Sequence, residues 1–375
     1  MKIVFISDQF YPRTSADSEQ IISSLSALSK FAEVTLISAK YSSKDATTQE
    51  RLESYYGRSC PFKLEFINHL FPFIRGIEKL TFALKVAFKV RNNNADFVYT
   101  RNIPIVLFTL LFTSHKVVFE SYRPWPERNI LSRLFFKRMA INKKFVGVVL
   151  HSKFAGESFK NVGFKPQNLL VAHNAFDFSV YNEVPKNEVC NNYDIPDNRI
   201  IVTYSGRVNV NKGLDRLFLL AEEFPEIFFL IVGSEREGEI EEQAKKFDNV
   251  KVLGWLSRAD VFSILTSSDI LYIPTTLRAR EVSKNTVLPI KTFIYKASGT
   301  AIFAPKSEDL LEVLEHKENA YLVNPDDWES EKMGFSELIK DNELRNRLGT
   351  SAQFQMMDNT WDARAKNILR FLRNQ

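Results

Sequence analysis

The chain contains few cysteines and few histidines, and their scarcity excludes some kinds of site. Only two of its 375 residues are cysteines, Cys60 and Cys190, which lie far apart in the sequence and lack metal-ligand spacing. The five histidines form no cluster either. We therefore expect no structural metal, and we expect a protein that works in a reducing cytoplasm.

Long hydrophobic runs are also absent. The longest, residues 103–112, is too short to span a bilayer and instead predicts a buried helix. The first residues have a strand pattern followed by the polar stretch 14–17, so we expect no signal peptide. We find no internal repeat or low-complexity tract. The length and the apolar fraction of 45% predict a globular chain of two domains.

Charge is divided unevenly along the chain. Residues 1–180 contain 25 Lys and Arg against 14 Asp and Glu, whereas residues 181–375 contain 25 against 31. Within the basic half, 70–91 and 129–138 interleave cations with aromatic and aliphatic residues. Such helices can lie on an anionic membrane, although surface helices of soluble domains share the pattern. We predict peripheral contact with the inner face of the cell membrane, and no nucleic-acid partner, because no binding motif accompanies the charge.

Strand and helix patterns alternate along the whole chain. Alternation of this kind predicts an α/β fold with parallel sheets covered by helices on both faces. A polar, proline-marked stretch at 178–194 suggests the boundary between the domains. The predicted strands lie near 2–7, 33–38, 63–67, 96–99, 116–120 and 146–150, and in a second series near 169–172, 200–204, 227–232, 250–253, 270–273 and 300–303.

The most informative stretch is 205–215, which follows the apolar run 200–204. It places Arg207 and Lys212 in a loop between two glycines, Gly206 and Gly213. A loop at the carboxyl end of a parallel strand lies where doubly wound sheets bind ligands, and glycines let the backbone approach closely. The arginine fork and the lysine point charge suit a diphosphate, although two solvated cations on a surface turn would have the same sequence.

This stretch and several others, taken in order, resemble the family-four (group 1) retaining glycosyltransferases. The resemblance implies the GT-B fold, in which two Rossmann-like domains face each other. It divides the chain into an acceptor-binding domain at 1–180, a nucleotide-sugar donor domain at 181–358, and a helix at 359–375 that returns to the first domain. The segments that carry it are 1–8, 11–13, 33–38, 97–102, 174–177, 205–215, 250–256, 267–274, 285–291 and 359–362.

The resemblance also implies a set of site residues. Arg207 and Lys212 would hold the diphosphate and stabilise it as it leaves, with no metal or other cofactor. The donor-binding residues would be Gly206, Gly233, Gly254, Leu256, Asn285, Thr286, Val287, Leu288 and Lys291. The residues that face the sugar and the acceptor would be Ser15, Arg101, Glu120, Tyr122 and Arg123.

The implied function is transfer of a sugar from a nucleotide-sugar to a hydroxyl of a glycan or a lipid-linked saccharide, in surface polysaccharide synthesis. Five positions depart from the family pattern. Ile294 and Thr286 replace a spaced glutamate pair, Tyr122 replaces a histidine, and Ser15-Ala16 replaces a glycine pair. Two alternatives therefore stay open: a non-catalytic GT-B partner subunit, and a sugar-nucleotide epimerase on the same fold.

Overall fold

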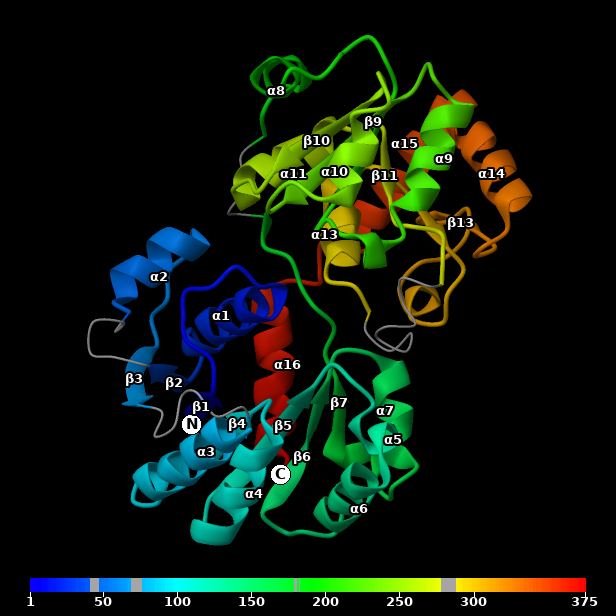
Figure 1. Cartoon of the computed structure of the whole chain (residues 1–375). Coiled ribbons are helices and arrows are strands. Elements are labelled where there is room, and N and C mark those ends of the chain that lie inside the picture. The colour runs from blue at the N-terminus through cyan, green and yellow to red at the C-terminus, as the bar shows by residue number, and fades with distance from the viewer. Residues whose placement is uncertain (41–46, 69–75, 179–180, 182, 278–287) are drawn as a thin grey trace. The chain divides into compact units, whose positions relative to one another are not determined.

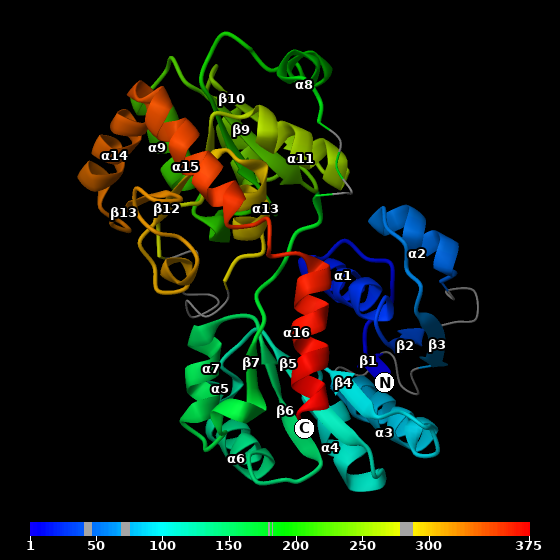
Figure 2. The ribbon, with the colours of Figure 1, turned by 180° about the vertical axis from the view of Figure 1, so that it is seen from behind.

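The structure is a computed structural model that describes residues 1–40, 47–68, 76–178, 181, 183–277 and 288–375. The chain divides into two compact units (Figures 1 and 2). The N-terminal unit comprises Met1–Asn174 together with Trp361–Gln375, and the C-terminal unit comprises Ala175–Thr360. Each unit contains one sheet of parallel strands with helices on both faces, so the predicted α/β class is confirmed.

The N-terminal sheet has seven strands in the order β3-β2-β1-β4-β5-β6-β7. Strand β1 pairs in parallel with β2 and β4, so Val4 lies opposite both Thr35 and Val98. The strand order reverses at β1, and ligands of doubly wound sheets bind at such a switch point. The strands are β1 (Lys2–Ser7), β2 (Glu33–Lys40), β3 (Lys63–Asn68), β4 (Phe97–Thr100), β5 (Lys116–Ser121), β6 (Phe145–Leu150) and β7 (Leu169–Val171).

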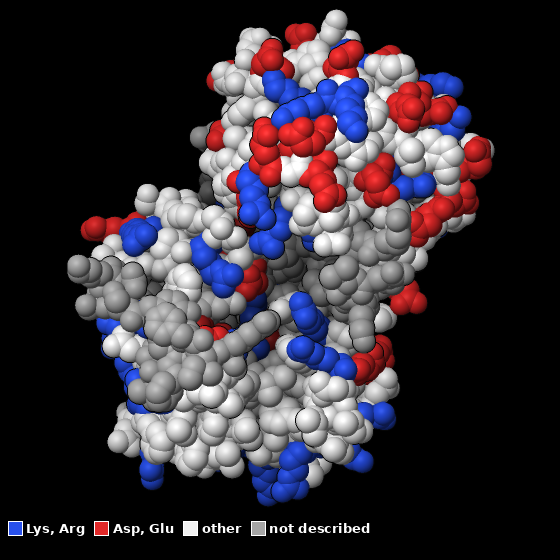
Figure 3. All heavy atoms as spheres, viewed as in Figure 1, with Lys and Arg blue, Asp and Glu red and all other residues white. Residues whose placement is uncertain are grey.

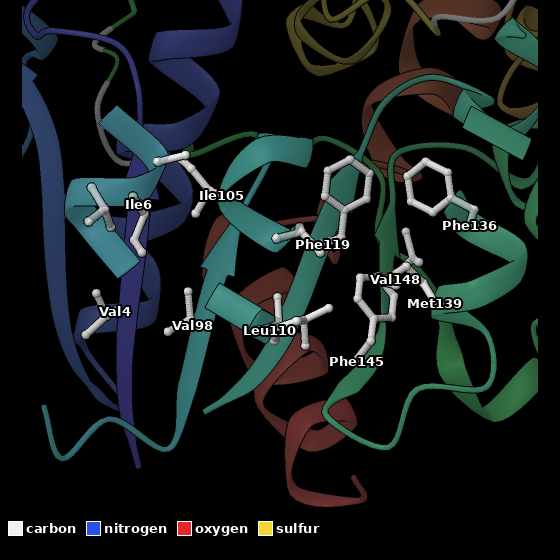
Figure 4. Close-up of a cluster of buried hydrophobic side chains, with 14 of the residues drawn as sticks. Val4, Ile6, Val98, Ile105, Leu110, Phe119, Phe136, Met139, Phe145 and Val148 are labelled. Carbon is white, nitrogen blue, oxygen red and sulfur yellow. The ribbon is translucent and has the colours of Figure 1, made fainter. Parts of the chain in front are cut away.

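Helices cover both faces of this sheet. On one face α3, α4, α6 and α7 share an apolar core with the strands, in which Leu110 and Phe136 pack near Phe119 and Val148 (Figure 4). On the other face α1 packs against α16, the last helix of the chain (Figure 2). The helices are α1 (Ala16–Ser29), α2 (Gln49–Tyr56), α3 (Ile77–Val90), α4 (Ile103–Phe112), α5 (Trp125–Arg128), α6 (Ile130–Met139), α7 (Lys153–Lys160) and α16 (Trp361–Arg373).

The C-terminal sheet has six strands in the order β10-β9-β8-β11-β12-β13, so its order reverses at β8. Val202 and Tyr204 of β8 point into a core shared with α9 and α14, whereas Ile201 points into one shared with α8. The strands are β8 (Ile201–Ser205), β9 (Phe228–Ser234), β10 (Val250–Gly254), β11 (Ile270–Tyr272), β12 (Ala301–Pro305) and β13 (Tyr321–Val323). The helices are α8 (Lys186–Tyr193), α9 (Asp215–Glu223), α10 (Glu239–Ala244), α11 (Arg258–Ser267), α13 (Lys291–Ser298), α14 (Trp328–Lys340) and α15 (Asn342–Phe354).

Several elements differ from the sequence prediction. The strand expected to open the second series, β7, pairs with β6 at the edge of the N-terminal sheet. The stretch expected to be a linker contains α8, because Val189 and Cys190 are buried against the C-terminal sheet. Helix α4 is not fully buried, since Leu111 and Phe112 are exposed. Within the described ranges no helix is both long and apolar enough to cross a membrane.

Candidate active site

Two glycines bring the loop after β8 close to the end of β9. The amide of Gly206 donates a hydrogen bond to the carbonyl of Val232 at 2.9 Å. Both Gly206 and Gly233 have positive φ, +141° and +112°, a region that side chains with a Cβ rarely adopt. A Cβ on Gly233 would also lie 2.6 Å from the carbonyl oxygen of Gly206. The close approach of this loop to β9 therefore depends on glycine at both positions.

Arg207 and Lys212 follow directly, and both lie on this loop. The Arg207 side chain is more than half exposed, and its Nε lies 3.8 Å from Glu235. The pKa of Lys212 is lowered, first by burial and then by the charge of Arg207. Arg207 and Lys212 repel each other in the free protein. A bound anion reduces this repulsion, so the pair is suited to bind one.

Lys291, in the first turn of α13, supplies a third cation. Its Nζ lies 3.7 Å from the centre of the Tyr204 ring, a cation–π contact, and 2.8 Å from the position of a Cβ on Gly206. The loop is anchored from both sides, since the Tyr204 hydroxyl donates to the carbonyl of Arg207 at 3.0 Å and the amide of Ser205 donates to the Tyr295 hydroxyl at 2.7 Å. The structure thus brings Lys291 to the Gly206 loop, on which Arg207 and Lys212 lie and interact electrostatically.

The remaining donor-side predictions divide into three groups. Gly254 ends β10 and lines a shallow pocket between α10 and the ends of β9 and β10, together with Ser234 and Glu235. Leu256 packs on the core beside β8 and β9. The side chain of Leu288 is buried in the core under α13, so only its backbone amide, the group predicted to bind the donor, could contact a ligand. Asn285, Thr286 and Val287 lie outside the described residues.

In the N-terminal unit the structure corrects the role predicted for Glu120. This carboxylate is buried, and one of its oxygens accepts hydrogen bonds from Arg364 at 2.7 Å, His151 at 2.7 Å and Arg101 at 2.9 Å. Gln20 donates to it at 3.3 Å. Burial alone would raise the pKa of Glu120, but the two guanidinium groups hold it well below the usual range. Glu120 therefore ties α16 to the strand ends and does not face an acceptor.

His151, which sequence reasoning passed over, is part of this cluster. His151 comes directly after β6, just as Arg101 comes directly after β4. A polar residue at the end of a parallel strand is a candidate site residue, and this position in the sequence could have identified His151. Burial lowers the pKa of His151 to about 4, although the Glu120 carboxylate acts in the opposite direction. The imidazole is therefore neutral near pH 7.

Arg101 retains hydrogen-bonding capacity. Its Nη2 contacts Gln20 and Glu120, whereas Nε and Nη1 are buried and have no hydrogen-bond partner among the described residues. Unsatisfied guanidinium donors of this kind suit a ligand oxygen. Tyr122 lies beside His151 with ring centres 6.3 Å apart, and the Arg123 guanidinium lies 5.1 Å from the centre of the Tyr122 ring.

Ser15 has a local role at the start of α1. It is the N-cap residue, and its hydroxyl accepts from the amide of Ser18. Among the described residues no group of three or more His, Cys, Asp and Glu side chains is placed to hold a metal ion.

Comparison with known proteins identifies a family domain within the chain. Residues 186–355 match the model of glycosyl transferases group 1. The chain carries a group 1 glycosyltransferase domain. This domain contains the Gly206 loop, both of its cations and Lys291. None of the curated proteins compared with the chain matches it.

Solved structures of glycosyltransferases superpose on the whole chain and show that it has the GT-B fold. Anabaena HepE, solved in complex with UDP and glucose, superposes with a TM-score of 0.76 at 17% identity, with 100% of both chains covered. Sucrose-phosphate synthase from Thermosynechococcus elongatus gives 0.76 at 14%, with 100% of this chain and 98% of the other covered. WaaG, a glycosyltransferase involved in lipopolysaccharide biosynthesis, gives 0.70 at 11% and covers 100% of both chains.

Proposed function

We propose that the protein transfers a sugar from a nucleotide-sugar to a hydroxyl of a glycan or lipid-linked saccharide in surface polysaccharide synthesis. Retention of the anomeric configuration, independence of metals, and work at the inner face of the cell membrane are parts of this proposal. The observation that carries it is the set of three cations, Arg207, Lys212 and Lys291, at the Gly206 loop. The HepE complex with UDP and glucose and the lipopolysaccharide role of WaaG support the donor and acceptor classes.

In the proposed reaction the main task of the protein is to stabilise the negative charge of the leaving diphosphate, and proton transfer is less important. As the bond between the sugar and the diphosphate breaks, negative charge grows on the phosphate oxygens. Arg207 can bind two of these oxygens, and Lys212 and Lys291 add point charges. The first turn of α13 adds the partial positive charge of a helix start. Fixed charges aimed at a leaving group lower the barrier because they need no reorganisation when the bond breaks.

On the acceptor side we assign the role to Arg101. Its Nε and Nη1 groups are buried and unpaired, so an acceptor hydroxyl or carboxylate that enters beside them would gain two hydrogen-bond donors, while Glu120 and Gln20 hold the guanidinium in place. The aromatic ring of Tyr122 and the exposed Arg123 lie nearby along the chain and would complete this surface. In this proposal Glu120 positions Arg101 and does not contact the substrate.

A second candidate is a partner subunit with the GT-B fold and no catalysis. The observation that favours it is Ile294, which packs against the apolar core under α13 at the position where the family usually has a ribose-binding glutamate. A donor site without that carboxylate would bind the ribose more weakly.

Ligand-induced thermal stabilisation separates the two candidates. We would titrate the protein with UDP, GDP and ADP and with their hexose derivatives, since a ligand bound only by the folded state raises the melting temperature. Arg207→Ala and Lys212→Ala should remove the stabilisation and lower turnover by roughly two to three powers of ten. The control Lys246→Ala removes an exposed cation after α10 and should change neither. Stabilisation with turnover of a sugar would establish the transferase. Stabilisation without turnover, or stabilisation by none of the ligands, would refute the transferase and favour the non-catalytic candidate.

A further inference from the structure

One face of the N-terminal unit exposes large apolar side chains in unusual number. It is the outer surface of α3, α4 and α6, which lie on the same side of the sheet. Leu111 of α4 is 63% exposed and Leu131 of α6 is 75% exposed, although leucine usually contributes to a core. The exposed apolar residues of this α3–α4–α6 face are Ile77, Leu80, Phe88, Leu107, Leu111, Phe112, Ile130, Leu131, Leu134 and, just after α6, Ile141.

The aromatic residues of this face are held in a fixed arrangement. Phe88 stacks on Phe112 with ring centres 5.3 Å apart, and Phe112 stacks on Phe108 at 6.0 Å. Phe88 comes from the end of α3 and Phe112 from the end of α4. Two adjacent helices therefore present one preformed apolar ridge rather than scattered side chains.

Cations border the apolar residues, and acidic residues are scarce. Residues 129–144 contain no Asp or Glu. In the part of the chain that the structure describes, the nearby cations Arg91, Arg133, Lys137, Arg138 and Lys143 have no ion-pair partner. Figure 3 shows the same face as mostly uncharged over α3, α4 and α6, with Lys and Arg along its lower edge. This combination of a wide apolar surface and unpaired positive charge indicates an amphipathic, anionic partner.

We propose that the α3–α4–α6 face docks on a bilayer that contains anionic phospholipids. Phe88, Leu111 and Leu131 would enter the boundary between headgroups and acyl chains, and the cations would contact the phosphates. A second copy of the chain is a poorer occupant, because a two-fold contact through this face would place cations against cations. The inference rests on the proposed function in one respect: a lipid-linked acceptor gives the docking a purpose.

Vesicle co-sedimentation tests the proposal. The full-length protein should bind vesicles of phosphatidylcholine mixed with phosphatidylglycerol, bind phosphatidylcholine alone much less, and release from the mixed vesicles as salt is raised. A triple variant, Arg133→Gln, Lys137→Gln and Arg138→Gln, should bind on the order of a hundredfold more weakly, since each cation near an anionic surface contributes about 1 kcal/mol. Leu111→Gln combined with Leu131→Gln and Leu134→Gln should weaken binding at least tenfold.

Matched controls come from the C-terminal unit. Met333→Gln with Phe354→Gln changes two similarly exposed apolar residues, and Lys246→Gln with Lys340→Gln removes exposed cations; both should bind vesicles as the unmodified protein does. Failure of the unmodified protein to bind mixed vesicles, or equal binding by the face variants and the controls, would overturn the proposal. So would a dimer in solution that the leucine variant converts to monomers. Nucleotide-induced thermal stabilisation, measured on the same samples, reports on the proposed function separately, because these variants leave the donor residues intact.

Discussion

The carbonyl oxygen of Gly206 occupies the space that a side chain on Gly233 would need, only 2.6 Å from the Cβ position. The contact is with backbone, which cannot rotate away as a long side chain can. Since Gly206 begins the loop that carries Arg207 and Lys212, any shift forced at Gly233 moves the cationic cluster. The donor site therefore depends on a residue that carries no functional group.

Gly233→Ala should destabilise the C-terminal unit by about 1–3 kcal/mol, because the backbone there has φ of +112° and because the new methyl group meets Gly206. Urea unfolding gives the change, and nucleotide titration should show weakened binding. Gly254→Ala is the matched control, since its Cβ would meet nothing closer than 3.8 Å. It should cost less than about 1 kcal/mol. Equal costs for the two variants would contradict the packing argument.

Glu120→Gln should destabilise the N-terminal unit by about 3–5 kcal/mol, because it leaves the guanidinium groups of Arg101 and Arg364 buried without a counter-charge. The free energy of unfolding in urea measures the cost. Lys30→Gln provides the comparison, since the exposed pair Lys30–Asp362 also joins α1 to α16. Its loss should cost less than about 1 kcal/mol. A cost for Glu120→Gln no larger than that of Lys30→Gln would show that the buried cluster contributes little.

Stability should fall between pH 6.5 and about 4 because of His151. Its pKa is 6.5 in the unfolded chain and about 4 in the folded protein, so in this window the unfolded state binds more protons. Acidification therefore favours unfolding by roughly 3 kcal/mol across the window, and the effect levels off below pH 4. His151→Gln, whose amide can still donate to Glu120, should remove this part of the pH dependence. Unfolding curves of the unmodified protein and of His151→Gln, measured at several pH values, test this prediction. If the free energies of unfolding of the two proteins change with pH in parallel, His151 is not the group responsible.

Local patterns in the sequence were sufficient to predict most of the fold. Alternating strand and helix patterns placed β1, β2, β3 and the core strands of the C-terminal sheet within a few residues. Local patterns do not say which sheet a short edge strand joins, and β7 was accordingly placed in the wrong series. The apolar stretch of α4 likewise cannot show that one side of the helix lacks a covering element.

The candidate site divides in the same way. The Gly206 loop and its cations are adjacent in the sequence, so their spacing could be read directly. Glu120 pairs with Arg364, which lies 244 residues further along the chain, and only the return of α16 to the N-terminal unit brings the two together. The family resemblance places Glu120 at a strand end that faces the acceptor, and nothing near it in the sequence indicates its buried partner Arg364.

Ile294→Glu tests what the missing family glutamate means in this chain. Ile294 packs against the apolar core under α13, so a carboxylate there should lose that packing and be partly desolvated. We expect a destabilisation of about 2 kcal/mol or more, whereas Ile294→Met should cost less than about 1.5 kcal/mol. Thermal unfolding with and without nucleotide separates stability from affinity. If the variant unfolds normally and binds nucleotide more tightly, the side chain faces the ribose and the donor pocket follows the family pattern. If it is destabilised without a gain in affinity, Ile294 belongs to the core, and recognition of the donor depends on Arg207, Lys212 and Lys291.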